Sequence, residues 1–318
     1  MNAQKAAWRI VKEEKQAILP SGNIINYVDS GTKGTVVLLL HGQTGAWQCY
    51  SKVIQKLYQK CHVFALDLYG HGKSSHDESL YYLGVNGDDM IWFINNVIKE
   101  PTVIAGHSNG ALLAAYVAAY GGELVKGCVL EDPPVFSTER GEFEKTFAYV
   151  DTYKVMHDYL NSDQKDCWPV YYLEHCYWAN TFMPKAVPSM VKTARKYRQK
   201  HPNKPVRIFY MPSMVNEMFA FVDQYDLRYG EHFYDYTWHS GIAHEKLVSD
   251  IHVPTIYIHA KESYTKDGIL QCAASLAQAK EAVSLIQGDC RFFETKNSQH
   301  DIHNLVPDWY VEKLELLL

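Results

Sequence analysis

The sequence predicts an α/β fold with a mostly parallel, doubly wound sheet and an inserted, mainly helical segment. Three observations support this prediction. Short apolar runs alternate with helical patterns up to residue 134 and again after residue 250. Some of these runs, such as residues 35–40, are apolar throughout, as expected for strands buried on both faces of a parallel sheet. Between residues 135 and 250 these runs stop, and aromatic residues become frequent.

The first part of the chain begins with a charged helical pattern and then alternates between strand and helix patterns. Residues 1–15 form a short amphipathic helix pattern, and turn residues at 20–23 indicate a hairpin. The expected strands are 16–19, 24–28, 35–40, 63–66, 102–105 and 127–130, and the expected helices are 46–60, 86–99 and 111–120.

The alternation returns after the aromatic-rich segment. The expected elements there are a strand at 254–259, a helix at 268–285, a strand at 291–294 and a closing helix at 306–318. We therefore expect an α/β core made of residues 1–134 and 251–318, and a helical cap, or lid, over residues 135–250. A length of 318 residues fits one large domain with such an insertion.

Composition restricts the possible partners. The chain has a formal net charge of -5, and its Lys and Arg residues are spread along the sequence, so nucleic-acid binding is not indicated. The seven cysteines form no C-x-x-C pair, which argues against a disulfide frame. No run approaches the roughly 18 apolar residues of a membrane helix, and the first 15 residues lack the apolar core of a signal peptide. We expect a cytoplasmic protein that acts on a small molecule and has no membrane partner, with its oligomeric state left open.

A Gly-x-Ser-x-Gly pattern lies where the strand at 102–105 meets the following helix. Ser108 is at the centre of the pattern, and Gly106 and Gly110 flank it. A sharp turn between strand and helix holds the serine in a strained backbone conformation and leaves room only for small residues two positions away. The turn presents the hydroxyl at the edge of the sheet, and we predict that Ser108 is a nucleophile.

A serine hydroxyl needs a base, a carboxylate that orients the base, and donors for the oxyanion. His300 follows the last predicted strand and is the predicted base, with His303 as its local competitor. His41 is expected to bond the loop backbone. His239 and His244 have no carboxylate or cysteine frame around them in the sequence, so we expect no metal and no cofactor.

These motifs resemble those of the α/β-hydrolase fold superfamily, and in particular its serine hydrolases with a helical cap. The resemblance rests on the Ser108 elbow, the late His300, residues 41–45 (HGQTG) and residues 67–74 (DLYGHGKS). It covers the chain outside residues 135–250, which lie where that family carries its cap.

The resemblance implies roles for further residues. It implies that the backbone N–H groups of Gln43 and Asn109 form the oxyanion hole, and that Asp67 is architectural. The family usually has a glycine before the catalytic histidine, and this chain has Gln299 there, after Ser298.

The acid of the triad has more than one candidate. The commonest family pattern places it after the strand that follows the insertion, where this chain has Ser263, with Glu262 beside it and Asp267 farther along. Other members, similar to haloalkane dehalogenases and zearalenone-type lactonases, carry it after the strand that follows the nucleophile helix. Glu131 and Asp132 occupy that position. We favour Asp132 and keep Glu262 as the alternative acid.

The sequence thus predicts a serine hydrolase, of the carboxylesterase or lactonase kind, that cleaves an ester or lactone of an apolar or aromatic small molecule through an acyl-enzyme. The aromatic insertion favours such a substrate. Epoxide hydrolases and dehalogenases use an aspartate nucleophile, whereas position 108 is serine. A carbon–carbon bond hydrolase acting on a diketone, a cofactor-free haloperoxidase-like enzyme and a non-catalytic ligand-binding member of the fold are the alternatives.

Overall fold

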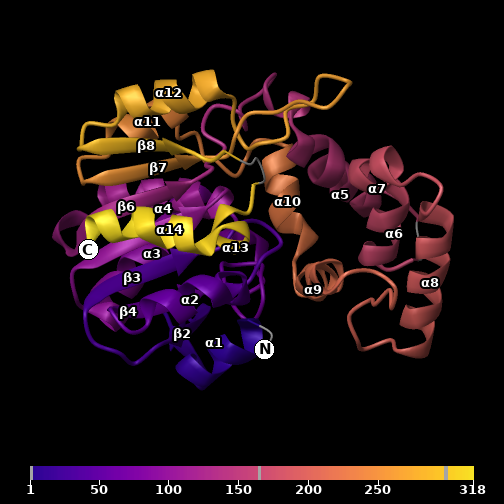
Figure 1. Cartoon of the computed structure of the whole chain (residues 1–318), viewed down its shortest axis with the longest axis horizontal. Helices are drawn as coiled ribbons and strands as arrows, with labels where there is room; N and C mark the ends of the chain where they lie inside the picture. The colour runs from indigo at the N-terminus through magenta and orange to yellow at the C-terminus, as the bar shows by residue number, and fades with distance from the viewer. Residues whose placement is uncertain (1–2, 164–165, 297–299) are drawn as a thin grey trace.

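A single mixed sheet forms the centre of the protein (Figure 1). The computed structural model describes residues 3–163, 166–296 and 300–318. The strands follow one another across the sheet in the order β1-β2-β4-β3-β5-β6-β7-β8. Their bounds are β1 Glu14–Ile18, β2 Ile24–Asp29, β3 Thr35–Leu40, β4 Cys61–Leu66, β5 Thr102–His107, β6 Val125–Glu131, β7 Thr255–His259 and β8 Cys290–Glu294. The pairs β1–β2 and β2–β4 are antiparallel and all other pairs are parallel, which confirms the predicted sheet.

The central strands are buried on both faces, because their side chains alternate between two separate cores. Val36, Leu38 and Leu40 of β3 belong to one hydrophobic core, while Val37 and Leu39 belong to the other. This alternation follows from the two-residue repeat of a strand. It explains why residues 36–40 are apolar throughout.

Helices cover both faces of the sheet, as a doubly wound fold requires. The first core also contains residues of α3 (Leu83–Phe93), α4 (Asn109–Tyr120), α11 (His244–Ser249) and α12 (Leu276–Leu285). The second core contains residues of α1 (Ala3–Val11), α2 (Ser51–Leu57) and α14 (Pro307–Leu314). The short helix α13 (Ile302–Leu305) precedes α14.

The segment between β6 and β7 is helical. Its helices before α11 are α5 Lys154–Leu160, α6 Trp168–His175, α7 Tyr177–Phe182, α8 Val187–Lys200, α9 Ser213–Val222 and α10 Leu227–Tyr234. They extend to one side of the sheet, with α10 nearest to it and α8 at the far end (Figure 1). Side chains from α6, α7 and α8 form a third hydrophobic cluster that contains no strand residue.

Some predicted element bounds were wrong. The helix expected at 268–285 begins only at Leu276, because Ser275 and Gln278 form a capping box there. The N-terminal helix ends at Val11, and Glu14 and Lys15 belong to β1. Among the described residues, no helix combines the length and the apolar character that a membrane crossing requires.

Candidate active site

The turn after β5 holds Ser108 in a strained conformation. Its backbone angles are φ 55° and ψ -124°, in a region that a residue with a side chain rarely adopts. A Cβ atom on Gly106 would lie 2.1 Å from the carbonyl oxygen of Gly110, and a Cβ atom on Gly110 would lie 2.3 Å from the carbonyl oxygen of His41. Both glycines are therefore sterically required, and the backbone has the form of a nucleophile elbow.

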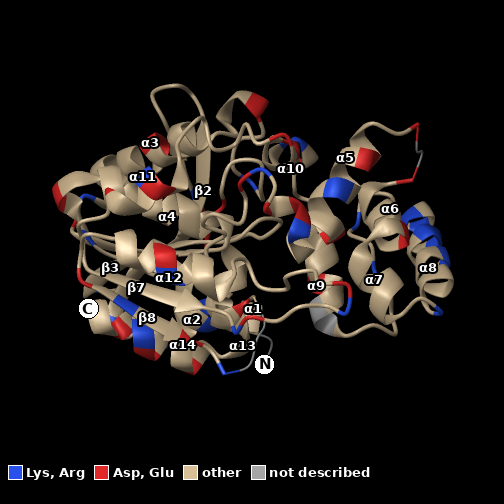
Figure 2. Ribbon diagram, turned by 90° about the horizontal axis from the view of Figure 1, so that it is seen from above, with Lys and Arg blue, Asp and Glu red and all other residues tan. Residues whose placement is uncertain are grey.

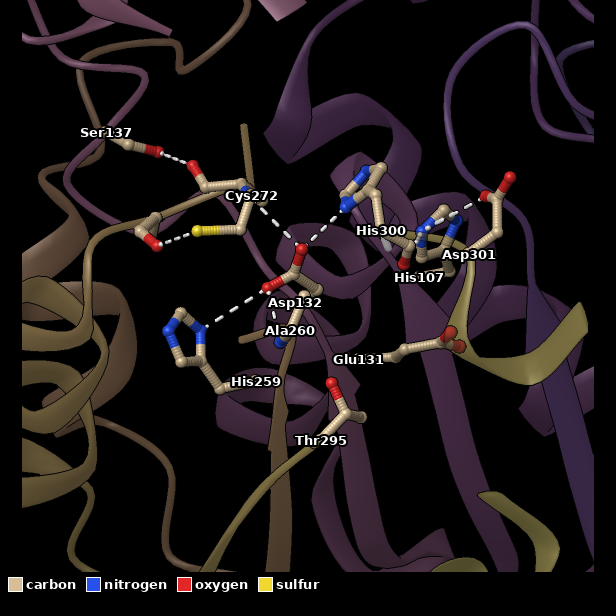
Figure 3. Close-up of polar contacts among 12 residues, drawn as sticks. His107, Glu131, Asp132, Ser137, His259, Ala260, Cys272, Thr295, His300 and Asp301 are labelled. Carbon is tan, nitrogen blue, oxygen red and sulfur yellow. Dashed lines mark hydrogen bonds and ion pairs between the residues drawn. The ribbon is translucent and has the colours of Figure 1, made fainter. Parts of the chain in front are cut away.

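Asp132 lies at the end of β6 with its carboxylate directed at His300 (Figure 3). His300 Nδ1–H donates a hydrogen bond of 2.6 Å to Asp132 Oδ2. The Asp132 side chain is fully buried and also accepts backbone N–H bonds from Ala260 (3.0 Å) and Ala273 (3.1 Å). Three donors from separate segments thus fix the carboxylate beside the imidazole.

The electrostatics favour a charged carboxylate and a basic imidazole. Burial raises the pKa of Asp132, but the nearby imidazoles of His259 and His300 outweigh it and hold that pKa well below its usual range. Burial lowers the pKa of His300, but the hydrogen bond and the charge of Asp132 outweigh it, so that this pKa is raised. With Nδ1 donating to Asp132, Nε2 is the ring nitrogen that can accept a proton.

The later acid candidates have other partners. Glu262 accepts the backbone N–H of Leu276 at the start of α12. Asp267 accepts a hydrogen bond of 3.1 Å from the hydroxyl of Tyr177. Of the candidate carboxylates, Asp132 is the one that the structure brings to His300.

Glu131 and His303 form a second buried pair behind the elbow. The Glu131 carboxylate accepts bonds from the backbone N–H (2.7 Å) and from Nδ1 (2.9 Å) of His303. Burial lowers the pKa of His303, but the charge of Glu131 outweighs it, so that this pKa is raised. The pair joins β6 to α13 and fixes the segment that follows His300.

One buried group has the composition of a metal site. The potential ligand atoms of His107, Glu131 and His303 lie within 4.8 Å of one another. A metal ion there would have to replace the hydrogen bonds between Glu131 and His303. The His239–His244 pair from the sequence has its ring nitrogens 3.2 Å apart, a hydrogen-bonding distance.

The two residues proposed for the oxyanion hole are tied to the insertion by their side chains. Gln43 Nε2 donates a bond of 2.6 Å to the hydroxyl of Tyr225, and Gln43 Oε1 accepts one from the hydroxyl of Tyr153. Asn109 Nδ2 donates to the hydroxyl of Tyr229 at 3.0 Å. The sequence analysis missed these tyrosines, although the density of tyrosine in the insertion was visible.

His259 is a second residue that the sequence analysis missed. Its Nδ1 lies 3.4 Å from Asp132 Oδ1, and both side chains are buried. It stands at the carboxyl end of β7, next to β6 in the sheet. The sequence signal that could have indicated this residue is a histidine at the carboxyl end of the otherwise apolar strand pattern.

His41 and Asp67 fix the loops around the elbow. His41 Nε2 accepts the backbone N–H of Leu68 at 3.0 Å, and Nδ1–H donates to Gly42 O at 2.7 Å. Asp67 accepts bonds from the N–H of Trp47 and from the side chain of Asn26. These contacts match the structural roles expected for His41 and Asp67.

Two pockets reach the candidate residues. One, of about 390 Å³, is lined by both aromatic and polar side chains; its residues are Phe147, Trp178, Phe182, Ala260, Ser263, Gln271, Cys272 and His300. The second, of about 450 Å³, includes Gln43, Asp301 and His303 in its lining. Ser298 and Gln299, which precede His300, lie outside the described residues.

Comparison with known proteins agrees with this architecture. The family model for the alpha/beta hydrolase fold matches residues 35–153. The human serine hydrolase-like protein is 30% identical over 149 residues, which are 46% of this chain and 73% of that protein. Mouse protein phosphatase methylesterase 1 is 33% identical over 97 residues, 28% of this chain and 25% of that protein. The structure of a hydrolase from Pseudomonas aeruginosa PA01 superposes with a TM-score of 0.67 at 12% identity, covering 96% of this chain and 98% of the other.

Proposed function

This chain belongs to the α/β-hydrolase fold family, and from that premise we propose that it is a serine hydrolase cleaving carboxylic esters or lactones. The catalytic residues of the proposal are Ser108, His300 and Asp132. The observation that carries it is the 2.6 Å bond between the buried Asp132 and His300, at the same sheet edge as the Ser108 elbow. One of the sequence relatives is a methylesterase by name, which supports an ester substrate.

The proposed mechanism begins with proton transfer from the Ser108 hydroxyl to Nε2 of His300, as Ser108 Oγ attacks the carbonyl carbon. Asp132 stabilises the imidazolium that forms. The oxyanion of the tetrahedral intermediate accepts hydrogen bonds from the backbone N–H groups of Gln43 and Asn109. His300 then returns the proton to the leaving oxygen, which leaves an acyl-enzyme.

Hydrolysis of the acyl-enzyme repeats these steps with water. His300 removes a proton from the water, whose oxygen attacks the ester of Ser108. The proton then passes to Ser108 Oγ as the acid product leaves. Every proton is moved by one imidazole, and none of these steps requires a cofactor or a metal.

The insertion supports an apolar or aromatic substrate. Phe147, Trp178 and Phe182 come from this segment and line the pocket that also contains His300. Aromatic side chains bury the apolar surface of a ligand, and a few polar groups then orient it. We accordingly propose that residues 135–250 act as the cap over a core made of residues 1–134 and 251–318.

Turnover of a substrate panel tests the proposal. The panel contains p-nitrophenyl esters, aryl lactones and a vinylogous diketone, each assayed with the wild type and with Ser108→Ala. We expect turnover of an ester or lactone by the wild type and its loss in Ser108→Ala. Turnover of the diketone alone would replace the ester assignment with carbon–carbon bond hydrolysis, and no turnover of any substrate would favour a ligand-binding role.

A further inference from the structure

The outer end of the insertion concentrates positive charge, in contrast to the even spread that the sequence suggested. Residues 175–216 contain eight of the chain's 31 Lys and Arg residues and none of its 36 Asp and Glu residues. The eight are Lys185, Lys192, Arg195, Lys196, Arg198, Lys200, Lys204 and Arg207. They lie around α8, at the end of the molecule farthest from the sheet (Figure 2).

Most of this charge is unpaired. Arg195 pairs with Asp166, and Arg198 pairs with Asp223. The other six side chains are exposed, and within the described part of the chain none of them has an acidic partner. This end of a protein with a net charge of -5 is therefore strongly basic.

The unpaired lysines of α8 lie on one side of the helix. Lys192, Lys196 and Lys200 are four residues apart, so they form a stripe along the helix. The buried residues Val191 and Ala194 face the opposite side and pack in the third hydrophobic cluster. The stripe consequently points away from the body of the insertion.

Two exposed aromatic rings lie beside this stripe. Phe209 is 82% exposed and Tyr210 is 47% exposed, and their ring centroids are 5.0 Å apart. The Tyr210 hydroxyl is 3.5 Å from Ser189 Oγ, and Ser189 lies on the lysine side of α8. The two adjacent rings form an exposed apolar patch beside charged side chains, which is the composition of an interaction surface.

We propose that this basic-aromatic surface, made of Lys192, Lys196, Lys200, Phe209 and Tyr210, docks the protein onto a bilayer that contains anionic lipids. Lysine side chains are attracted to anionic headgroups, a Phe ring enters the acyl boundary and a Tyr ring lies at headgroup level. The phosphates of a nucleic-acid duplex would also attract the lysines, but a duplex would leave the Phe209 ring exposed to water. The proposal revises the expectation that no membrane is a partner, and it does not depend on the proposed hydrolase activity.

Vesicle sedimentation tests this docking. We expect the full chain to bind vesicles of phosphatidylcholine and phosphatidylserine, and to bind vesicles of phosphatidylcholine alone much more weakly. Replacing Lys192, Lys196 and Lys200 by Gln should weaken binding to the anionic vesicles by about a hundredfold, at roughly a fivefold loss for each lysine. The control variant replaces Lys33, Lys126 and Lys280, which are exposed on the core, and removes the same charge.

The aromatic contribution has its own pair of variants. Phe209→Ala should weaken vesicle binding severalfold, whereas Ile18→Ala, which removes a side chain 68% exposed on β1, should not. Absence of binding to anionic vesicles would overturn the proposal, and so would an equal loss in the two triple variants. Displacement from the vesicles by double-stranded DNA would assign the surface to nucleic acid instead.

Discussion

At the scale of single residues, the bond between Asp132 and His300 depends on backbone groups that are distant in sequence. The N–H groups of Ala260 and Ala273 hold the carboxylate from two segments after the insertion. Asp132 itself has a positive φ of 42°, so its side chain leaves β6 in a turn. The position of the proposed acid, for which the sequence left candidates after two strands, therefore depends on contacts with three separate segments of the chain.

The pH dependence of turnover follows from this bond. Protonated His300 cannot accept the Ser108 proton, so kcat/KM should fall as the pH drops through the raised pKa of His300. Asp132→Asn removes the negative charge that raises the pKa of His300, while the burial that lowers this pKa remains. The fall of kcat/KM on the acid side should therefore move to lower pH. The measurement is a pH profile of kcat/KM for both proteins.

The loss of kcat on substitution distinguishes Asp132 from Glu262 as the acid of the triad. Asp132→Asn should lower kcat by about ten-thousandfold, because the imidazole loses its orienting partner. Glu262→Gln is the matched control and should leave kcat within about threefold, since Glu262 holds α12 and not the imidazole. The reverse result would move the acid to the segment after β7.

Sequence patterns located some site residues and missed others for a physical reason. Ser108 stands inside a local pattern whose neighbours are sterically fixed, so the pattern can be read along the chain. His259 and Tyr229 touch the site through contacts between segments that are far apart in sequence. No local spacing encodes those contacts, and they became visible only in the folded chain.

At the scale of elements, the Ser108 elbow depends on the close approach of β5 and α4. Gly106→Ala should lower the free energy of unfolding by about 3 kcal/mol, because its Cβ would meet backbone atoms that cannot move aside. Gly84→Ala is the control, since the space around Gly84 is open and its effect should stay within about 1 kcal/mol. Denaturant unfolding measures both, and equal costs would contradict this account of the turn.

A second element-scale feature is the contact between the insertion and the loop after β3. Removing the hydroxyls of Tyr153 and Tyr225 frees the Gln43 side chain, so the double variant with phenylalanine should lower kcat about tenfold with a smaller change in KM. Tyr120→Phe removes a tyrosine hydroxyl that donates to Asp250 and does not contact Gln43, and is the control. An unchanged kcat in the double variant would show that these bonds do not position Gln43.

The bounds of one strand and one helix show which structural features local sequence encodes and which it does not. The strand at 35–40 was predicted to the residue, because burial on both faces makes every position from Val36 to Leu40 apolar. The start of α12 was predicted eight residues too early, although Ser275 and Gln278 carry a capping pattern. Residues 268–275 instead form the loop that brings the Ala273 N–H to Asp132.

At the scale of the whole molecule, the insertion has an inner and an outer part. Tyr229, Phe233 and Trp238 share a hydrophobic core with the sheet, and so do Trp168 and Tyr171 on one side of α6. Helices α7 and α8 pack with the other side of α6 in a separate cluster. Helices that bury their apolar side chains in a separate cluster can open without unfolding the sheet. This arrangement would allow the proposed cap to move relative to Ser108, His300 and Asp132.

Hydrogen exchange should show this division. We expect the amides of α8 to exchange by a lower-energy opening than those of β5, which lies at the centre of the sheet. Mass spectrometry of exchanged peptides measures both in one experiment. Equal protection of α8 and β5 would mean that insertion and core open only together.

The central claim is that Ser108 is an activated nucleophile, and labelling with a fluorophosphonate tests it most directly. The reagent forms a covalent bond with a serine that an adjacent base activates, and peptide mass spectrometry identifies the labelled residue. We predict one label on Ser108 of the wild type, no label in Ser108→Ala and much slower labelling in His300→Ala. A wild-type protein that resists the reagent, or a label that persists in Ser108→Ala, would show that Ser108 is not an activated nucleophile.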